Sequence, residues 1–146
     1  MSTDLTIKVA STSEELSAAL EIRHRVFVRE QGIPAHLDTD GLDDSAIHAI
    51  CLVDGTIVAT GRLSILESRT AKLARIAVLH DYRGRGLGRL VVRELESIAS
   101  QHRVRTITIH PHDYLEEFYG SLGYIRVRGT SVVGRHDLIT MRKSLE

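Results

Sequence analysis

A glycine-rich turn, Arg83-Gly84-Arg85-Gly86-Leu87-Gly88, has the residue types and spacing of a phosphate-binding site. It follows an apolar run over residues 73–79 and opens a helix-like run over residues 87–100. The first amides of a helix have no partner inside the helix, and the helix dipole adds partial positive charge at the same end. The turn therefore predicts a site for a phosphate or pyrophosphate group, surrounded by the fixed charges of Arg83, Arg85 and Arg89.

Two other glycine motifs do not fit this turn. No Gly-Lys-Ser/Thr follows it, as a P-loop requires, and Arg89 stands where the third glycine of a dinucleotide-binding fingerprint would fall. The alternative to a phosphate site is a tight connection between a strand and a helix, with its arginines in solvent.

A pair of aromatic residues, Phe118-Tyr119, lies on a short predicted helix before Leu122-Gly123-Tyr124. A phenol has a pKa near 10, so Tyr119 can donate a proton to a leaving group that becomes strongly basic, such as a thiolate. The alternative is aromatic packing at helical spacing. Aromatic residues make up only 4% of the chain, so two adjacent ones slightly favour a specific role.

The segment His110-Pro111-His112-Asp113 follows a predicted strand and brings together residue types that bind metals. Its spacing matches no standard zinc pattern, and the proline stiffens it, so we predict no metal site there. His110 is instead a polar residue at a strand end, where a general base is one role open to it. Cys51 lies between two apolar residues of a strand, which favours packing over nucleophilic chemistry.

The composition predicts one cytoplasmic domain over residues 1–146. Lys plus Arg and Asp plus Glu both number 19, whereas a nucleic-acid-binding domain usually has a basic excess. The single cysteine allows no internal disulfide, which fits a reducing compartment. No apolar run reaches the length of a membrane span, and the N-terminus lacks the pattern of a signal peptide. We therefore expect neither nucleic acid nor a membrane as a partner.

Hydrophobic periodicity and turn residues predict the order β-α-β-β-β-α-β-α-β-β, a mixed α/β sheet of the α+β type. A helix begins at Ser13 and ends before Gly32, and Asp54-Gly55 marks a hairpin. Residues 35–45 are expected to form a polar loop. The other predicted helices cover residues 87–102 and 114–122, and the predicted strands cover residues 5–9, 46–53, 56–66, 71–79, 104–109, 124–128 and 137–142.

The turn and its surroundings resemble the GNAT superfamily of N-acetyltransferases over nearly the whole chain. Arg83 to Gly88 fits the Arg/Gln-x-x-Gly-x-Gly/Ala signature of that superfamily, with the strand Ala74-Arg75-Ile76-Ala77-Val78 before it and Phe118-Tyr119-Gly120-Ser121-Leu122-Gly123-Tyr124 after it. In the N-terminal half, Val26-Phe27-Val28-Arg29-Glu30-Gln31-Gly32-Ile33-Pro34 with Asp40 and His48 resembles the ElaA/YjcF-like branch.

The resemblance implies the acyl-CoA N-acyltransferase fold, a central twisted mixed sheet flanked by helices. Acetyl-CoA would lie between two splayed parallel strands that end near Val78 and Ile109. Its pantetheine would pair with the first strand, its pyrophosphate would bind the amides of the turn, and Tyr119 would protonate the departing thiolate. The implied coenzyme-binding residues are Ile76, Ala77, Val78, Arg83, Gly84, Arg85, Gly86, Leu87, Gly88, Arg89, His110 and Tyr119.

The implied reaction is direct transfer of an acetyl group to a primary amine of a small molecule or peptide. A backbone amide near Val78 can polarise the thioester carbonyl, and a base must first deprotonate the ammonium group. Glu30 and His48 are the candidate bases from the N-terminal half, and His110 is a third. Many relatives are dimers, so the resemblance also makes a second copy of the chain a candidate partner.

Two other functions remain open. One is a non-catalytic module on the same fold that binds or senses CoA. The other is nucleic-acid binding through the arginines between residues 83 and 105, which the neutral charge balance disfavours. The C-terminal segment Gly134 to Met141 departs from the superfamily pattern, so His136 has no assigned role. Arg126, Arg128 and Arg135 would suit an anionic substrate or a solvated surface.

Overall fold

The structure is a computed structural model that describes the backbone of residues 4–133 and 136–145. It describes the side chains of residues 4–127 and 138–145. The predicted elements occur in the predicted order, and short helical segments that were not predicted lie between some of them. The elements are β1 (Leu5–Val9), α1 (Ser13–Arg23), η1 (His24–Glu30), α2 (Ala35–Asp38), η2 (Asp43–Ser45), β2 (Ile47–Val53), β3 (Thr56–Ile65), β4 (Thr70–Val78), η3 (His80–Tyr82), α3 (Leu87–Gln101), β5 (Thr106–Ile109), η4 (Asp113–Leu115), α4 (Glu116–Ser121), β6 (Ile125–Val133) and β7 (His136–Ser144).

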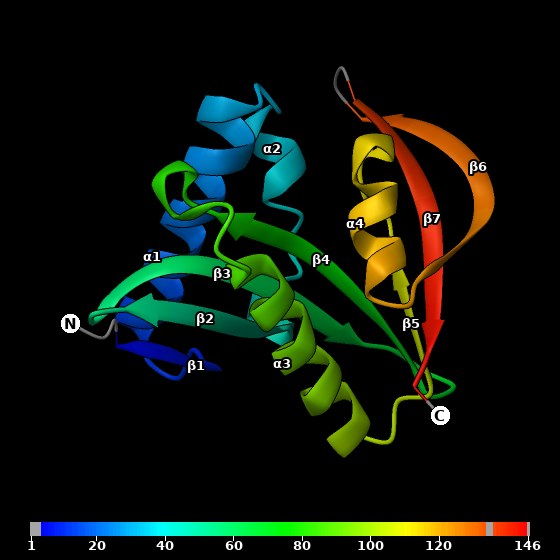
Figure 1. The fold of residues 1–146 in the computed structure, drawn as a ribbon, viewed down its shortest axis with the longest axis horizontal. Helices are drawn as coiled ribbons and strands as arrows, with labels where there is room; N and C mark the ends of the chain where they lie inside the picture. Colours follow the sequence, from blue (N-terminus) through cyan, green and yellow to red (C-terminus); the bar gives the residue numbers. More distant parts are fainter. Residues whose placement is uncertain (1–3, 134–135, 146) are drawn as a thin grey trace.

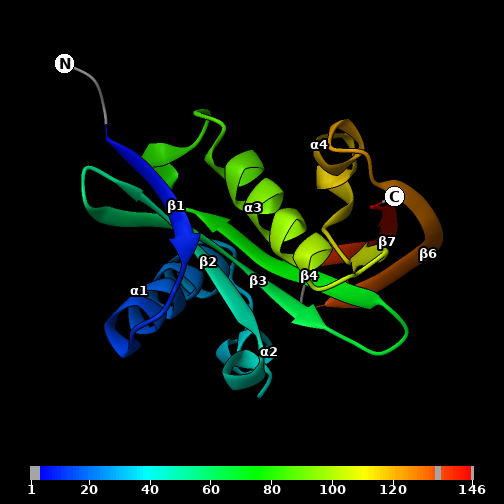
Figure 2. The same cartoon turned by 90° about the horizontal axis from the view of Figure 1, so that it is seen from below.

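The strands form one mixed sheet in the order β1-β2-β3-β4-β5-β7-β6. All neighbouring strands are antiparallel except β4 and β5, which are parallel and are joined through α3. Helices α1 and α2 cover one face of the sheet, and α3 and α4 lie on the opposite face (Figures 1 and 2). The predicted α/β class with a mixed sheet is confirmed.

The amphipathic sequence of α3 explains its place on the sheet. Its apolar residues recur three or four positions apart, so they form one stripe that packs on β2, β3 and β4. Gly61 of β3 allows a close approach, because a Cβ atom there would lie only 2.5 Å from Ile76 Cδ1 and 2.6 Å from Val91 Cγ1. The buried residues of the stripe are Leu87, Val91, Val92, Leu95, Ile98 and Ala99.

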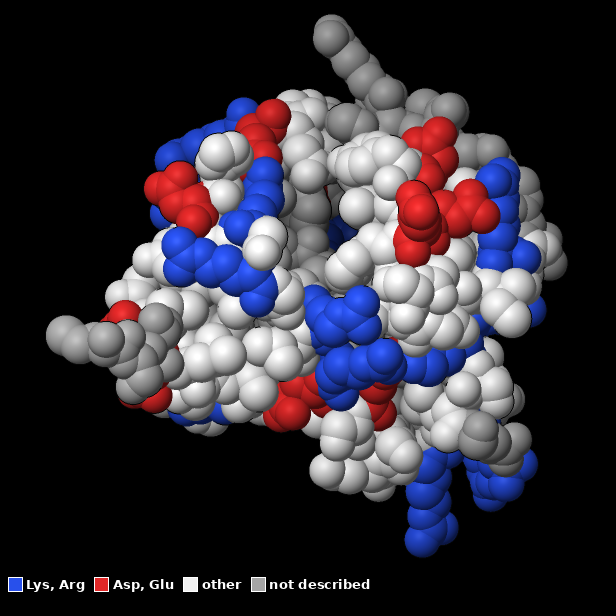
Figure 3. All heavy atoms as spheres, viewed as in Figure 1, with Lys and Arg blue, Asp and Glu red and all other residues white. Residues whose placement is uncertain are grey.

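The parallel strands β4 and β5 pair over a short distance and then separate. Pairing joins Thr70, Ala71 and Lys72 to residues 106–108, and β4 continues to Val78 without β5 beside it. Parallel strands that diverge leave backbone amides and carbonyls unpaired along the facing edges. Figure 3 shows the surface hollowed between the part of the molecule that carries η1 and α2 and the part that carries α4.

The N-terminal half differs from its prediction in two places. The helix from Ser13 changes at His24 from α to π geometry, in η1. The prediction of a polar loop over residues 35–45 is wrong, because this segment contains α2 and η2 and buries Asp38. A carboxylate can be buried when a cation and hydrogen bonds compensate it, and here Arg23 does so.

Within the ranges described above, no helix is both long enough and apolar enough to cross a lipid bilayer. Nor does the described part of the chain gather three or more His, Cys, Asp or Glu side chains in a group that could hold a metal ion.

Candidate functional site

The glycine turn forms an open cradle of backbone amides at the N-terminus of α3. Gly84 and Gly86 have φ angles of +78° and +77°, in the left-handed region that favours glycine. A Cβ atom at either position would meet nothing within 4 Å, so the space in front of the turn is free. Among the described residues, no acceptor bonds the amides from Gly84 to Arg89. These amides are therefore available to an anion.

Basic side chains surround the cradle. Figure 3 shows Lys and Arg gathered over the turn and the N-terminal part of α3. The Arg85 guanidinium lies 5.0 Å from the ring centroid of Tyr82, and Arg89 Nη2 lies 3.4 Å from Ser121 Oγ of α4. Neither arginine pairs with a carboxylate in the part of the chain that the structure describes. Both positive charges therefore act on whatever binds at the turn.

Arg83, in contrast, is held by two protein groups. Both of its terminal nitrogens bind the Glu30 carboxylate, with Nη2 2.8 Å from Oε1. Its Nε donates to the carbonyl of Val78 at 2.9 Å. The hydrogen bonds and the charge of Arg83 lower the pKa of Glu30 below its usual value. The end of η1, the end of β4 and the start of the turn are thus joined by one side chain.

Tyr119 lies in α4 and is packed among aromatic rings. Its ring packs edge-to-face against Phe118 and Tyr124, and the side chain is 5% exposed. A Cβ at Gly88 would lie 3.7 Å from Phe118 Cζ and 3.8 Å from Val78 Cγ2, so α4 meets the turn and the end of β4. Burial raises the pKa of Tyr119, which keeps the phenol protonated. In the described part of the chain its hydroxyl makes no hydrogen bond.

His110 follows the last residue of β5, directly past the point where β5 leaves β4. Its imidazole is exposed, and its Nδ1 lies 3.2 Å from Thr140 Oγ1 of β7. Partial burial, together with the charges of Lys72 and Arg142, lowers the pKa of His110 below 6.5. The ring is therefore neutral at pH 7, and one nitrogen can accept a proton.

His48 lies elsewhere. It belongs to β2, which β3 separates from β4, and its side chain is 5% exposed. Its Nε2 lies 2.9 Å from the Asp43 carbonyl and so carries the proton, because a carbonyl oxygen only accepts. Its buried Nδ1 finds no partner among the described residues. The structure therefore joins Glu30 to the turn and brings Phe118, the neighbour of Tyr119, close to Gly88, but it does not bring His48 to either.

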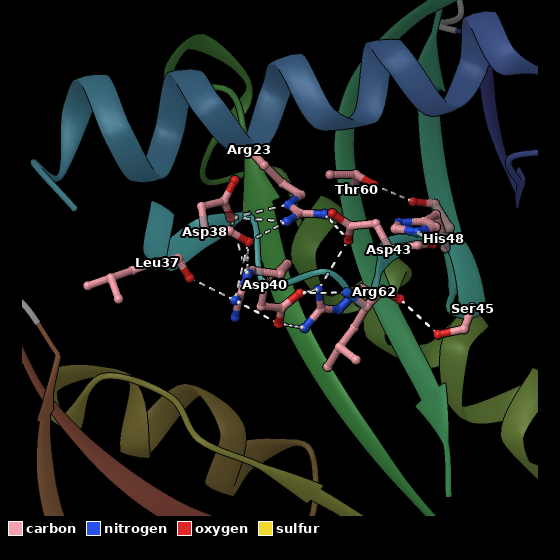
Figure 4. Close-up of polar contacts among 12 residues, drawn as sticks. Arg23, Leu37, Asp38, Asp40, Asp43, Ser45, His48, Thr60 and Arg62 are labelled. Atoms are coloured by element: carbon pink, nitrogen blue, oxygen red, sulfur yellow. Dashed lines mark hydrogen bonds and ion pairs between the residues drawn. The ribbon is translucent and has the colours of Figure 1, made fainter. Parts of the chain in front are cut away.

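A partly buried cluster of three arginines and three aspartates was not predicted. Arg23 of α1 binds Asp43 at 2.6 Å and Asp38 at 3.2 Å. Arg62 of β3 binds Asp40 at 2.8 Å and Asp43 at 3.1 Å (Figure 4). Arg75 of β4 is the third arginine, and it binds Asp38 and Asp40. The only signals in the sequence were Arg23 beside Ile22 on the apolar face of a helix and Arg62 between apolar strand residues.

The cluster changes the acidity of its members. Hydrogen bonds from Arg62 lower the pKa of Asp40 from 3.8 to about 2. Equal numbers of positive and negative groups leave the cluster without net charge. It therefore joins α1, α2, β3 and β4 rather than attracting an ion.

A separate pocket of about 720 Å³ lies between α4 and strands β6 and β7. No residue of the turn, of the β4 edge or of the Phe118-Tyr119 pair lines it, so it is not the predicted coenzyme site. Three carboxylates lie along it, and one of them, Glu116, binds Arg126 at 3.2 Å; the carboxylates are Asp113, Glu116 and Glu117.

Comparison with known proteins identifies proteins that are similar to this chain in sequence and fold. The model of the acetyltransferase (GNAT) family matches residues 14–124. The uncharacterized N-acetyltransferase YjcF of Bacillus subtilis is 29% identical and matches 80% of this chain and 82% of its own length. An acyl-CoA N-acyltransferase from Pseudomonas aeruginosa superposes with a TM-score of 0.83 at 28% identity, covering 97% of this chain and 99% of its own. Escherichia coli ElaA shares the fold, with a TM-score of 0.83 at 22% identity and the same coverage.

Proposed function

The chain belongs to the acetyltransferase (GNAT) family, and from this premise we propose that it is an acetyl-CoA-dependent N-acetyltransferase. The acceptor in this proposal is a primary amine of a small molecule or peptide. The main observation that supports this proposal is the open amide cradle from Gly84 to Arg89. The cradle follows β4, whose edge toward β5 is unpaired beyond Lys72 among the described strands. The proposal places the enzyme in the cytoplasm and allows a homodimer.

Two parts of the chain suit two parts of acetyl-CoA. The free amides of the turn and the charges of Arg85 and Arg89 suit its pyrophosphate. Over Ile76, Ala77 and Val78 the edge of β4 that faces β5 is not paired with a described strand, so its backbone groups suit the amides of the pantetheine arm. We propose that the coenzyme binds along this path, with its thioester directed toward Tyr119.

Tyr119 is the proposed general acid. Direct attack by a neutral amine expels a CoA thiolate, which needs a proton as it leaves. A buried phenol with a raised pKa remains protonated until a strong base forms beside it, and among the described residues the Tyr119 hydroxyl has no partner that would compete. Holding amine and thioester in one gap supplies a further part of the rate through proximity.

His110 is the proposed general base among the three candidates. The Glu30 carboxylate binds Arg83 with both oxygens, and its lowered pKa makes it a weak proton acceptor. His48 is buried in β2, and both β3 and β4 lie between β2 and β5 in the sheet. His110 is exposed, follows the end of β5, and has a pKa below its usual value, which favours the neutral ring at pH 7. It can take a proton from the ammonium group directly or through water.

Calorimetry with CoA and acetyl-CoA, combined with a thiol-release assay over a panel of amines, tests the proposal. Gly86→Ala places a Cβ in the cradle and should weaken CoA binding at least about tenfold. Gly55→Ala is the matched control, because Gly55 has a similar φ of +83° and equally free space but lies in the β2–β3 hairpin. It should bind CoA as the wild type does.

The outcomes separate the candidate functions. Tight binding with turnover of an amine supports the enzyme. Tight binding with no turnover on any amine supports a CoA-binding module instead. A chain that binds neither CoA nor acetyl-CoA excludes both.

A further inference from the structure

Arg75 has a backbone conformation that its residue type disfavours. Its φ angle is +58°, in the left-handed region, although it lies within β4. The register explains why: Thr60 pairs with Ala77 and Arg62 with Ala74, so two residues of β4 oppose one residue of β3. Arg75 thus forms a β-bulge, a feature that bends a strand and re-aims the residues after it.

The residues after the bulge are those proposed to pair with the coenzyme. Ile76, Ala77 and Val78 complete β4 beyond the point where β5 leaves it. The direction of their backbone groups depends on the bulge, because a strand that continued in regular register would rotate each of them. A conformation that costs free energy persists only where surrounding contacts enforce it.

The Arg75 side chain makes those contacts, and all its acceptors lie within four consecutive residues. Its Nη2 donates to the Leu37 carbonyl at 3.1 Å, and its Nε lies 3.3 Å from the Asp38 carbonyl. Its Nε also lies 3.2 Å from Asp38 Oδ1, and its Nη2 lies 3.3 Å from Asp40 Oδ2. A planar guanidinium with several donors in a fixed arrangement can bind such a set, and a lysine cannot.

The acceptors of Arg75 are themselves held in place. Asp38 binds Arg23, whose side chain is 1% exposed, and Asp40 binds Arg62, whose side chain is 5% exposed. Removing one member of such a cluster leaves an uncompensated buried charge, so the remaining contacts resist displacement. The segment from Leu37 to Asp40 is therefore a firm anchor.

We propose that Arg75 is a positioning residue for the coenzyme. Its guanidinium, bound to residues 37–40, holds the left-handed bulge that aims the backbone of Ile76 to Val78 into the gap. The inference rests on the proposed function, and it adds that the segment on the α2 side determines the shape of the coenzyme edge.

Two substitutions at this one position test the proposal. Arg75→Ala removes the anchor and keeps a residue that disfavours the left-handed region, so CoA should bind about tenfold more weakly. Arg75→Gly removes the same anchor but adopts the bulge conformation without cost, so CoA affinity should recover to within about twofold of wild type. In kinetics, KM for acetyl-CoA should follow the same order while kcat changes less.

Arg69 provides the matched control pair. It is also a non-glycine residue with a φ of +58°, but it lies in the exposed turn between β3 and β4. Arg69→Ala and Arg69→Gly should differ from each other in melting temperature and not in CoA affinity. A recovery by glycine at residue 75 alone therefore reports on the bulge rather than on stability.

Equal CoA affinity of Arg75→Ala and Arg75→Gly, whether strong or weak, overturns this inference and leaves the proposed function intact. A wild-type chain that binds no CoA overturns both the inference and the proposed function.

If Arg75→Ala does not fold, Asp40→Asn and Asp43→Asn replace it. Asp40 binds Arg75, whereas Asp43 binds Arg23 and Arg62. Asp40→Asn should therefore weaken CoA binding by about threefold, and Asp43→Asn should not weaken it. Equal affinities of these two variants would contradict the proposal.

Discussion

Arg83 binds the Glu30 carboxylate with both terminal nitrogens while its Nε donates to the carbonyl oxygen of Val78. The two side chains are separated by 53 residues in sequence, so the pair connects the end of η1 to the start of the glycine turn. The turn cannot shift relative to β4 without breaking the bond to Val78. The N-terminal helical segment therefore helps to fix where the amide cradle lies.

Glu30→Gln should weaken acetyl-CoA binding and leave the chemistry unchanged. The pair is more than one third exposed on both sides, and surface ion pairs contribute about 0–1 kcal/mol, so KM for acetyl-CoA should rise only about two- to fivefold. The pH dependence of kcat should stay as in the wild type. Steady-state kinetics from pH 5 to pH 9 measures both quantities.

Glu116→Gln is the control for Glu30→Gln, since Glu116 and Arg126 form an ion pair of similar exposure away from the turn. It should leave KM for acetyl-CoA unchanged. If Glu30→Gln instead abolishes turnover at an unchanged KM and removes one limb of the pH profile, Glu30 is the general base and the assignment to His110 is wrong.

Tyr119→Phe should lower kcat by about a hundredfold with CoA affinity unchanged, because general acids typically contribute at least that factor. Phenylalanine retains the ring that packs against Phe118 and Tyr124, so the fold should persist. Tyr82→Phe removes a hydroxyl from a ring in η3, beside Arg85 and not in α4, and should retain the wild-type kcat. Unchanged kcat in Tyr119→Phe would leave Tyr119 as a packing residue.

His110 should determine the acidic limb of the pH–rate profile. A general base works in its neutral form, so kcat/KM should rise with pH through a pKa below 6.5 and be constant near pH 7. His110→Gln should lose that limb and most of the activity. His102→Gln, at the exposed C-terminal end of α3, should keep both. A limb that survives in His110→Gln belongs to another group.

The fold and the glycine turn could be predicted because their signals are local. A run of apolar residues, two glycines and a stripe at helical spacing specify β4, the turn and α3 within about 30 residues, and the superfamily signature lies in the same stretch. The Phe118-Tyr119 pair could also be placed on a helix near the turn. How that helix faces the gap follows from the packing of Phe118 near Gly88 and Val78, which no short pattern reveals.

The arginine–aspartate cluster was missed because its pairs lie far apart in the chain. Arg23 and Asp38 are 15 residues apart, and Arg75 and Asp38 are 37 apart. An acidic segment with glycine between two apolar elements has the composition of a solvated loop, so Asp38 and Asp43 gave no sign of burial. The left-handed Arg75 was equally hidden, since only its tertiary contacts explain it.

Asp40→Asn should destabilise the protein at neutral pH and lose its effect in acid. The pKa of Asp40 is about 2 in the folded protein against 3.8 for the free side chain. A carboxyl group with a lowered folded pKa adds stability above its unfolded pKa, and this contribution disappears as pH falls from about 4 to about 2. Solvent screens the exposed Asp40, so the difference between wild type and Asp40→Asn should be about 1 kcal/mol at pH 7 and shrink toward zero near pH 2.

Urea unfolding of both proteins from pH 7 down to pH 2 measures this difference. Asp44→Asn is the control, because Asp44 lies in the same segment and forms no ion pair among the described residues. It should match the wild type at every pH. A stability gap for Asp40→Asn that stays constant or widens below pH 4 would mean that the amide disturbs packing, and that the ion pair with Arg62 contributes little.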